Sequence, residues 1–251
     1  MSEELLDLLG AKSGLVCAIG AGGKKTTLYT LARHHPGRIA ITASVFVTWF
    51  PTDLGAQTIV GPESGIRTDV LDAKASRRIA YACVSDKKGR HAGVPPETIA
   101  AIHRDGRFDA TFVKADGARM RWLKAPKEGE PVITPGCDTI IAVLSARAIG
   151  EVLSERIAHR LERVETVKGA RRTDPFTPDH FARLLTQPGG LQKGTGDARF
   201  IPVINMVDDD ALEARAREAA QIALASTSRF DRVILASMRR SDDPVVAVVE
   251  R

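Results

Sequence analysis

Residues 14–27 read GLVCAIGAGGKKTT, and this stretch decides the fold. Its first half is a continuous apolar run, which is typical of a parallel strand covered on both faces. Glycines follow, and residues 26–35 are expected to form a helix that ends at Pro36 and Gly37. Glycines let backbone N–H groups turn toward a phosphate, while the helix N-terminus and a lysine add positive charge. The stretch therefore predicts a phosphate-binding strand, loop and helix.

We predict that the whole loop binds the phosphates of a nucleotide. The predicted binding residues are Gly20, Ala21, Gly22, Gly23, Lys24, Lys25, Thr26 and Thr27. The full GxxxxGK[ST] pattern is not met, because Ala18 stands five positions before Gly23, where the pattern has a glycine. The loop is therefore a shortened form of the pattern. In it, Lys24 is the expected phosphate lysine and a predicted catalytic residue. The alternative is a tight turn whose glycines serve packing alone, and the two lysines and two threonines at the helix start disfavour it.

A second candidate is the apolar strand predicted at 110–115, which ends at Asp116. This arrangement resembles a Walker B element, whose carboxylate holds Mg²⁺ directly or through water. We therefore predict Asp116 as a catalytic residue and, with Thr26, as a metal ligand. Many strands end in Asp because Asp favours turns, so this element alone is weak evidence.

The third candidate is Asn205-Met206-Val207-Asp208, which follows a predicted strand at 200–204. GTPases carry Asn-Lys-x-Asp at such a place, and the Asp accepts hydrogen bonds from the guanine edge. We predict that Asn205 and Asp208 contact the nucleotide, although Met206 occupies the lysine position. Capping of the next helix by Asp208 or Asp209 is the alternative.

The remaining pattern alternates strands with helices. Further strands are predicted at 38–44, 77–85, 139–145, 233–236 and 245–249, and helices from Ser2, from Pro95 to about His103, at about 150–163, after Thr177 and at 211–225. Residues 51–65, 119–135 and 188–196 are expected to be mostly irregular. This order predicts an α/β fold of the three-layer P-loop NTPase type, a mostly parallel sheet with helices on both faces. We expect one domain over residues 1–251, with a small subregion inserted around 51–93.

Composition narrows the partners. The net charge of +5 is spread along the chain without a long basic run, and aromatic residues make up only 5%, so we expect no nucleic acid partner. The three cysteines form neither a CxxC pair nor a disulfide framework, which favours the reducing cytoplasm. The acidic N-terminus is unlike a secretory signal, and no apolar run is long enough to span a membrane. Histidine and cysteine spacing gives no zinc pattern.

With these elements in order, the chain resembles the YqeC family, described as accessory proteins of selenium-dependent molybdenum hydroxylases. The residues that carry the resemblance are Gly20-Ala21-Gly22-Gly23-Lys24, Ala115-Asp116-Gly117-Ala118, Lys124-Ala125-Pro126, Glu130-Pro131, His159-Arg160, and Asn205 with Asp208. The resemblance covers most of the chain. It implies a nucleotide-binding accessory protein with ATP or GTP as cofactor, possible weak hydrolysis, and a molybdenum hydroxylase as client.

Three departures from the family pattern concern the metal and the base. Lys25 stands where the family has a threonine, Lys114 replaces a glutamate, and Met206 replaces a lysine. The two lysines suggest a degenerate metal site at which Mg²⁺ is dispensable. A shifted register, with Lys25 as phosphate lysine and Thr26 on the metal, would place Lys24 where the loop normally needs glycine.

The long segment 119–135 follows Asp116 and carries Arg119, Arg121, Lys124 and Lys127. These residues are expected to meet an anionic second substrate such as a phosphorylated pterin, or else to form a solvated basic loop. Two other functions stay open. One is a non-catalytic phosphate-binding module, and the other is a small-molecule kinase or ligase with a shortened GxxGK loop.

Overall fold

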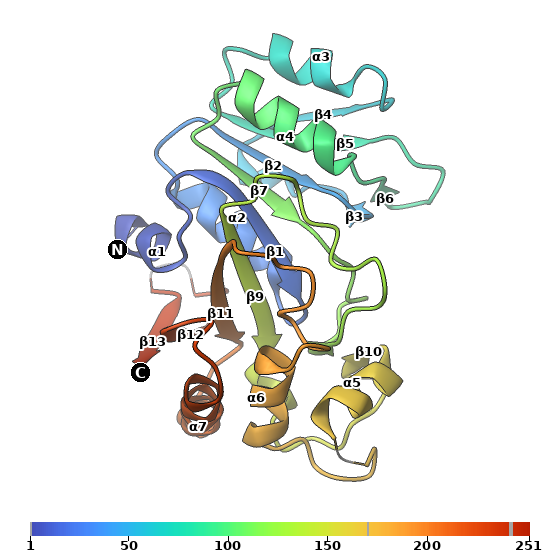
Figure 1. The fold of residues 1–251 in the computed structure, drawn as a ribbon. Coiled ribbons are helices and arrows are strands. Elements are labelled where there is room, and N and C mark those ends of the chain that lie inside the picture. The colour runs from blue at the N-terminus through green and yellow to red at the C-terminus, as the bar shows by residue number, and fades with distance from the viewer. Residues whose placement is uncertain (1, 170, 241–242) are drawn as a thin grey trace. The chain divides into compact units, whose positions relative to one another are not determined.

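The computed structural model describes residues 2–169, 171–240 and 243–251 (Figure 1). The main strands are β1 (Gly14–Gly20), β2 (Ile39–Ala43), β4 (Gln57–Gly61), β5 (Arg78–Cys83), β7 (Ala110–Lys114), β9 (Thr139–Ser145), β11 (Arg199–Asn205), β12 (Arg232–Ala236) and β13 (Val245–Glu250). They form one sheet in the order β13-β12-β11-β9-β1-β7-β2-β5-β4. The sheet is mostly parallel, with β13 antiparallel to β12. The predicted three-layer α/β fold is confirmed.

The helices and short elements complete the chain. The helices are α1 (Ser2–Leu8), α2 (Lys24–His34), α3 (Ile66–Asp72), α4 (Pro96–Asp105), α5 (Leu161–Lys168), α6 (Pro178–Thr186) and α7 (Asp210–Ser226). Two 3₁₀ turns are η1 (Thr52–Leu54) and η2 (Ala146–Ala148), and two-residue strands pair as β3 (Val47–Thr48) with β6 (Arg90–His91) and β8 (Leu123–Lys124) with β10 (Ala158–His159). None of the helices in the described ranges combines the length and apolar character needed to span a bilayer.

The chain divides into two compact units. The first comprises Met1–Ala18, Thr27–Asp116 and Val132–Ile140, and the second comprises Ile19–Thr26, Gly117–Pro131 and Ile141–Arg251. Strands β1 and β9 and helix α2 each contribute residues to both units. The prediction of a single domain stays a prediction.

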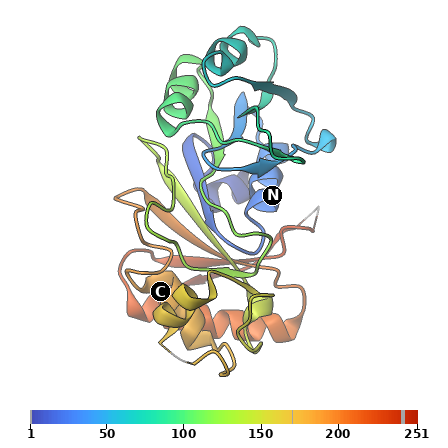
Figure 2. The ribbon, with the colours of Figure 1, turned by 90° about the vertical axis from the view of Figure 1, so that its right-hand side faces the viewer.

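In the first unit, β1 pairs with β7 in parallel register, with Ala18 opposite Lys114. β2 pairs with β7 and β5, and β4 pairs with β5, all in parallel. The inner strands are buried along almost their whole length, which explains their continuous apolar sequences. Helices α3 and α4 lie side by side (Figures 1 and 2).

In the second unit, helices α6 and α7 pack together, and α7 also contacts β12 and β13 (Figures 1 and 2). The inner face of α7 is mostly alanine: Ala216, Ala219, Ala220 and Ala223 are fully buried, and Leu224 is nearly so. Small side chains let a helix approach its neighbours closely. Asp209 caps α7, because its side chain accepts a hydrogen bond of 2.8 Å from the Leu212 N–H.

Two sequence predictions were wrong. The segment 51–65 was expected to be mostly loop, but it contains η1 and the strand β4. The side chains of β4 are largely exposed. The helix predicted at about 150–163 does not form, because His159 pairs with Lys124 in a two-residue parallel ladder and Arg160 adopts φ 61°. The helix α5 begins only after that left-handed residue.

Candidate functional site

The glycine loop leads from β1 into α2, and helix α2 begins at Lys24, directly after Gly23. Two N–H groups of the glycine loop donate hydrogen bonds to backbone carbonyls elsewhere in the chain. The Ala21 N–H donates to the Val143 carbonyl at 2.7 Å, and the Gly22 N–H donates to the Arg121 carbonyl at 2.9 Å. The loop shape is thus set by the end of β9 and by segment 117–131. That Gly23 and the first turn of α2 contact a phosphate stays a prediction.

Glycine is required in this loop for two physical reasons. Gly22 and Gly23 have φ angles of 71° and 127°, which side-chain-bearing residues rarely adopt. A Cβ atom on Gly22 would lie 2.6 Å from the Ser145 Cβ, and one on Gly23 would lie 2.1 Å from the Asn205 Nδ2. These glycines therefore serve close packing as well as any ligand.

Lys24 lies over the loop. Its side chain is buried, and its Nζ donates to the carbonyl of Gly20. Lys25 and Thr26 are half-buried, whereas Thr27 is fully buried. The ammonium of Lys24 is thus held at the Gly20 carbonyl, where the glycine loop begins.

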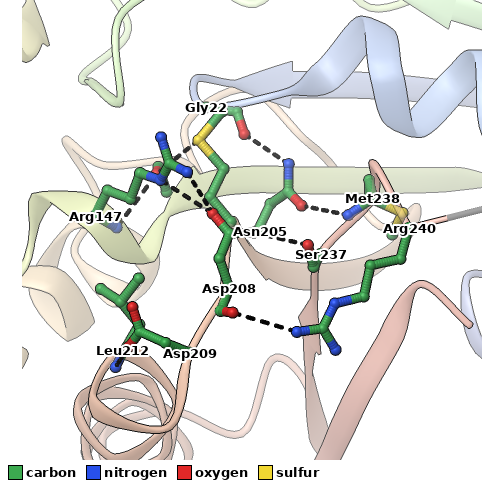
Figure 3. Close-up of polar contacts among 11 residues, drawn as sticks. Gly22, Arg147, Asn205, Asp208, Asp209, Leu212, Ser237, Met238 and Arg240 are labelled. Carbon is green, nitrogen blue, oxygen red and sulfur yellow. Dashed lines mark hydrogen bonds and ion pairs between the residues drawn. The ribbon is translucent and has the colours of Figure 1, made fainter.

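Asn205 connects the loop to the end of β12 (Figure 3). Its Nδ2 donates to the Gly22 carbonyl at 2.8 Å, and its Oδ1 accepts from the Met238 N–H at 3.0 Å. The side chain is 3% exposed. Asn205 was predicted as a nucleotide contact, and in this structure it positions the loop.

Asp208 lies in a network of donors at the same end of the sheet (Figure 3). Its Oδ2 accepts from Nη2 and Nε of Arg147 at 2.6 and 3.0 Å, and its Oδ1 accepts from the Ser237 hydroxyl at 2.7 Å. Burial raises the pKa of Asp208, but the hydrogen bonds from Ser237 and Arg147 outweigh it and lower the pKa below its ordinary value. Asp208 is therefore a carboxylate with an arginine partner, and Asp209 is the helix cap.

Met206 occupies the lysine position of the Asn-Lys-x-Asp element. Its φ is 62°, and the hydroxyl of Ser145 lies 3.1 Å from its sulfur. Ser145 and Arg147 were not singled out by sequence analysis. Ser145 ends β9 and Arg147 lies just after it, and no local pattern links them to residues 205–208.

The predicted metal ligands belong to different units. Asp116, in the first unit, is 1% exposed, and Thr26 lies in the second unit. Lys114, also in the first unit, donates from its Nζ to the Phe46 carbonyl at 2.8 Å. Across the described ranges, His, Cys, Asp and Glu side chains form no group of three or more arranged to hold a metal ion. The metal role of Thr26 and Asp116 stays a prediction.

The segment 117–131 holds a buried ionic cluster. The Nζ of Lys124 lies 2.7 Å from Oε2 of Glu130, and Arg160 donates to both Glu130 oxygens at 2.6 and 2.7 Å. Burial raises the pKa of Glu130, but these two cations outweigh it and lower the pKa to about 2. Lys124 is fully buried, so it does not lie in a solvated basic loop, which was the alternative for this segment. Its contact with an anionic second substrate stays a prediction.

His159 lies beside this cluster. Its pKa is lowered to about 4, first by burial and then by repulsion from Arg160, Lys124 and Arg119. The cations around His159 thus favour its neutral ring.

The strand, glycine loop and helix, with a lysine over the loop, define an α/β protein with a P-loop-type cradle. A family model described as YqeC protein matches residues 16–162, more than half of the chain, and the chain belongs to the YqeC family. It is 25% identical to the YqeC protein of Escherichia coli (strain K12) over 181 residues, which cover 71% of this chain and 70% of that protein. The crystal structure of HypB from Helicobacter pylori in complex with nickel covers 96% of this chain and 86% of that chain, with 11% identity and a TM-score of 0.41.

Proposed function

We propose that this protein binds the phosphates of ATP or GTP at residues 20–27. The observation that carries the proposal is the position of Lys24, whose buried ammonium is held over a glycine loop that leads directly into α2. A phosphate entering there would exchange the Gly20 carbonyl for a charged acceptor. The ammonium is already a charged donor, and an anionic acceptor adds charge–charge attraction that the neutral carbonyl lacks, so the exchange favours binding.

We further propose that the protein acts in the cytoplasm as an accessory factor in the maturation of a molybdenum-cofactor hydroxylase. Membership of the YqeC family supports this role. The lysine at position 25, where a hydroxyl ligand of Mg²⁺ is expected, supports binding with slow hydrolysis, and it equally favours a binding module without turnover.

An anionic second substrate, such as a phosphorylated pterin, fits the positive surplus of segment 117–131. Arg119 and Lys127 are exposed there, and Arg121 is half-buried. The Arg121 carbonyl of the same segment accepts a hydrogen bond from the Gly22 N–H, so the segment directly contacts the glycine loop.

Calorimetric titration with ATP and GTP tests the nucleotide site. Lys24→Ala should weaken binding at least tenfold, on the scale of a lost charge-assisted contact. Lys12→Ala is the matched control, because Lys12 is an exposed lysine that pairs with Asp7. Absence of binding by the wild type would overturn the proposal. Phosphate release measured with the same samples separates a slow NTPase from a binding module.

A further inference from the structure

In the proposed nucleotide site, Asp208 is the residue expected to recognise the base, and its carboxylate is paired with Arg147. The inference drawn from this pair rests on the proposed function. We propose that Arg147 covers the carboxylate of Asp208, so that the protein selects nucleotides by their phosphates and discriminates poorly between guanine and adenine. Arg147 is then a specificity-determining residue.

The geometry shows why the carboxylate is covered. Oδ2 of Asp208 accepts two hydrogen bonds from the Arg147 guanidinium, and Oδ1 accepts one from Ser237 (Figure 3). Guanine offers two adjacent N–H donors, which need both oxygens of one carboxylate. A carboxylate has about four acceptor sites, and three of those of Asp208 are used within the protein.

The backbone of Arg147 is anchored, and this sets where its side chain starts. Its N–H donates to the Ser145 hydroxyl at 3.3 Å, which caps η2. Ser145 is fully buried at the end of β9. The guanidinium therefore starts from an anchored turn and reaches Asp208, which stands at the start of the segment leading to α7.

A second arginine strengthens the positive side of this element. The guanidinium of Arg240 donates to the backbone carbonyl of Asp208 at 3.3 Å. The surroundings of Asp208 thus carry two cations, and the potential there favours acceptors over the donors of a guanine edge.

The size of the effect is limited by exposure. The side chains of Arg147 and Asp208 are 48% and 34% exposed, and exposed ion pairs are individually weak. GTP can therefore displace Arg147 at a small cost, so the lost preference for guanine is modest. We expect about a fivefold change in relative affinity on removing the arginine.

Competition binding of GTP against ATP tests the inference. The wild type should prefer GTP by about threefold or less, and Arg147→Ala should raise that ratio about fivefold. Arg147→Gln, which keeps most of the side-chain length, should do the same. Adding Asp208→Ala to Arg147→Ala should remove the gain. Arg156→Ala is the matched control, since Arg156 is an exposed arginine paired with Glu151.

The outcomes separate the two proposals. A strong preference of the wild type for GTP, or an unchanged ratio in both Arg147 variants, overturns the role of Arg147 while nucleotide binding stands. A large loss of GTP and ATP affinity in Arg147→Ala also overturns it, because the arginine would then be a binding residue. Failure of the wild type to bind either nucleotide overturns the proposed function itself.

Discussion

The side-chain amide of Asn205 donates to the backbone carbonyl of Gly22 at 2.8 Å, although the two residues are 183 positions apart in the sequence. The oxygen of the same amide accepts a hydrogen bond from the Met238 N–H. One buried side chain therefore connects the glycine loop, the end of β11 and the end of β12. The shape of the loop thus depends on a residue that the sequence pattern suggests for the nucleobase.

Asn205→Ala should therefore reduce both stability and nucleotide affinity. The substitution removes the hydrogen bonds to the Gly22 carbonyl and from the Met238 N–H, which costs about 1–3 kcal/mol of unfolding free energy. Because the loop loses its support, we expect nucleotide affinity to fall about tenfold as well. Denaturant unfolding and calorimetric titration measure the two effects.

Gln221→Ala is the control for Asn205→Ala, since Gln221 is an exposed amide on α7. An Asn205→Ala variant that binds nucleotide as tightly as the wild type would show that the loop keeps its shape without this clamp.

The register of the two loop lysines gives a second prediction. Lys24 is buried over the loop and Lys25 is half-buried, so Lys24→Ala should weaken nucleotide binding far more than Lys25→Ala. Loss of a charge-assisted contact in a partly desolvated site should cost about 1.5–3 kcal/mol. Calorimetric titration of both variants decides between the registers. Equal losses, or a larger loss for Lys25→Ala, would mean that the shifted register is correct.

The sequence predicts the sheet well where its strands are buried on both faces. The predicted strand at 139–145 matches β9 residue for residue, because all its side chains are buried and its apolar run has clear ends. β4 was missed because it is largely exposed and carries polar residues among Pro and Gly. The prediction of a helix at about 150–163 was wrong, because the pairing of His159 with Lys124 is long-range and leaves no local signal in the sequence.

In the candidate site, too, local features could be predicted from the sequence and long-range contacts could not. The glycine loop is local, so its lysine and its helix could be located from residues 14–27. The partners of Asp208 could not be found in this way, because Arg147 and Ser237 reach it only through the strand order of the folded sheet. Lys124 was expected to meet an anionic second substrate or to lie in a solvated loop, and only the fold shows that it is buried and paired with Glu130, which Arg160 also contacts.

The buried ionic cluster gives a prediction for acid stability. The pKa of His159 is about 4 in the folded protein against an ordinary value of 6.5, so folding favours the neutral ring. Its contribution to stability is complete above pH 6.5 and is lost as the pH falls through about 4. The carboxylate of Glu130, with a pKa of about 2 against 4.5, adds a loss that begins only below pH 4.5.

His159→Gln should therefore flatten the decline of unfolding free energy between pH 6.5 and 4. Because the ring is only partly buried, we expect a difference of about 1 kcal/mol across that interval. Urea unfolding of wild type and variant at several pH values measures it. The rest of the chain is the same in both proteins, so subtracting the curves isolates the effect of His159. Parallel curves would contradict the lowered pKa.

The last prediction concerns Mg²⁺. Lys25 stands where a hydroxyl ligand of Mg²⁺ is expected, and its ammonium supplies positive charge that the metal would otherwise bring to the phosphates. Lys114, the second departure from the family pattern, donates to the Phe46 carbonyl, so the argument here relies on Lys25. We expect nucleotide binding by the wild type to fall less than about tenfold when Mg²⁺ is replaced by EDTA.

Lys25→Thr should restore a dependence on the metal, because it removes the ammonium and returns the hydroxyl ligand. The variant should bind nucleotide more weakly than the wild type in EDTA, by about tenfold, and should recover much of that loss in Mg²⁺. Lys25→Met separates the two causes, since it removes the charge without supplying a ligand, and it should stay weak in both conditions. A wild type that loses more than tenfold in EDTA, or that hydrolyses nucleotide briskly with Mg²⁺, would show that Lys25 does not replace the metal.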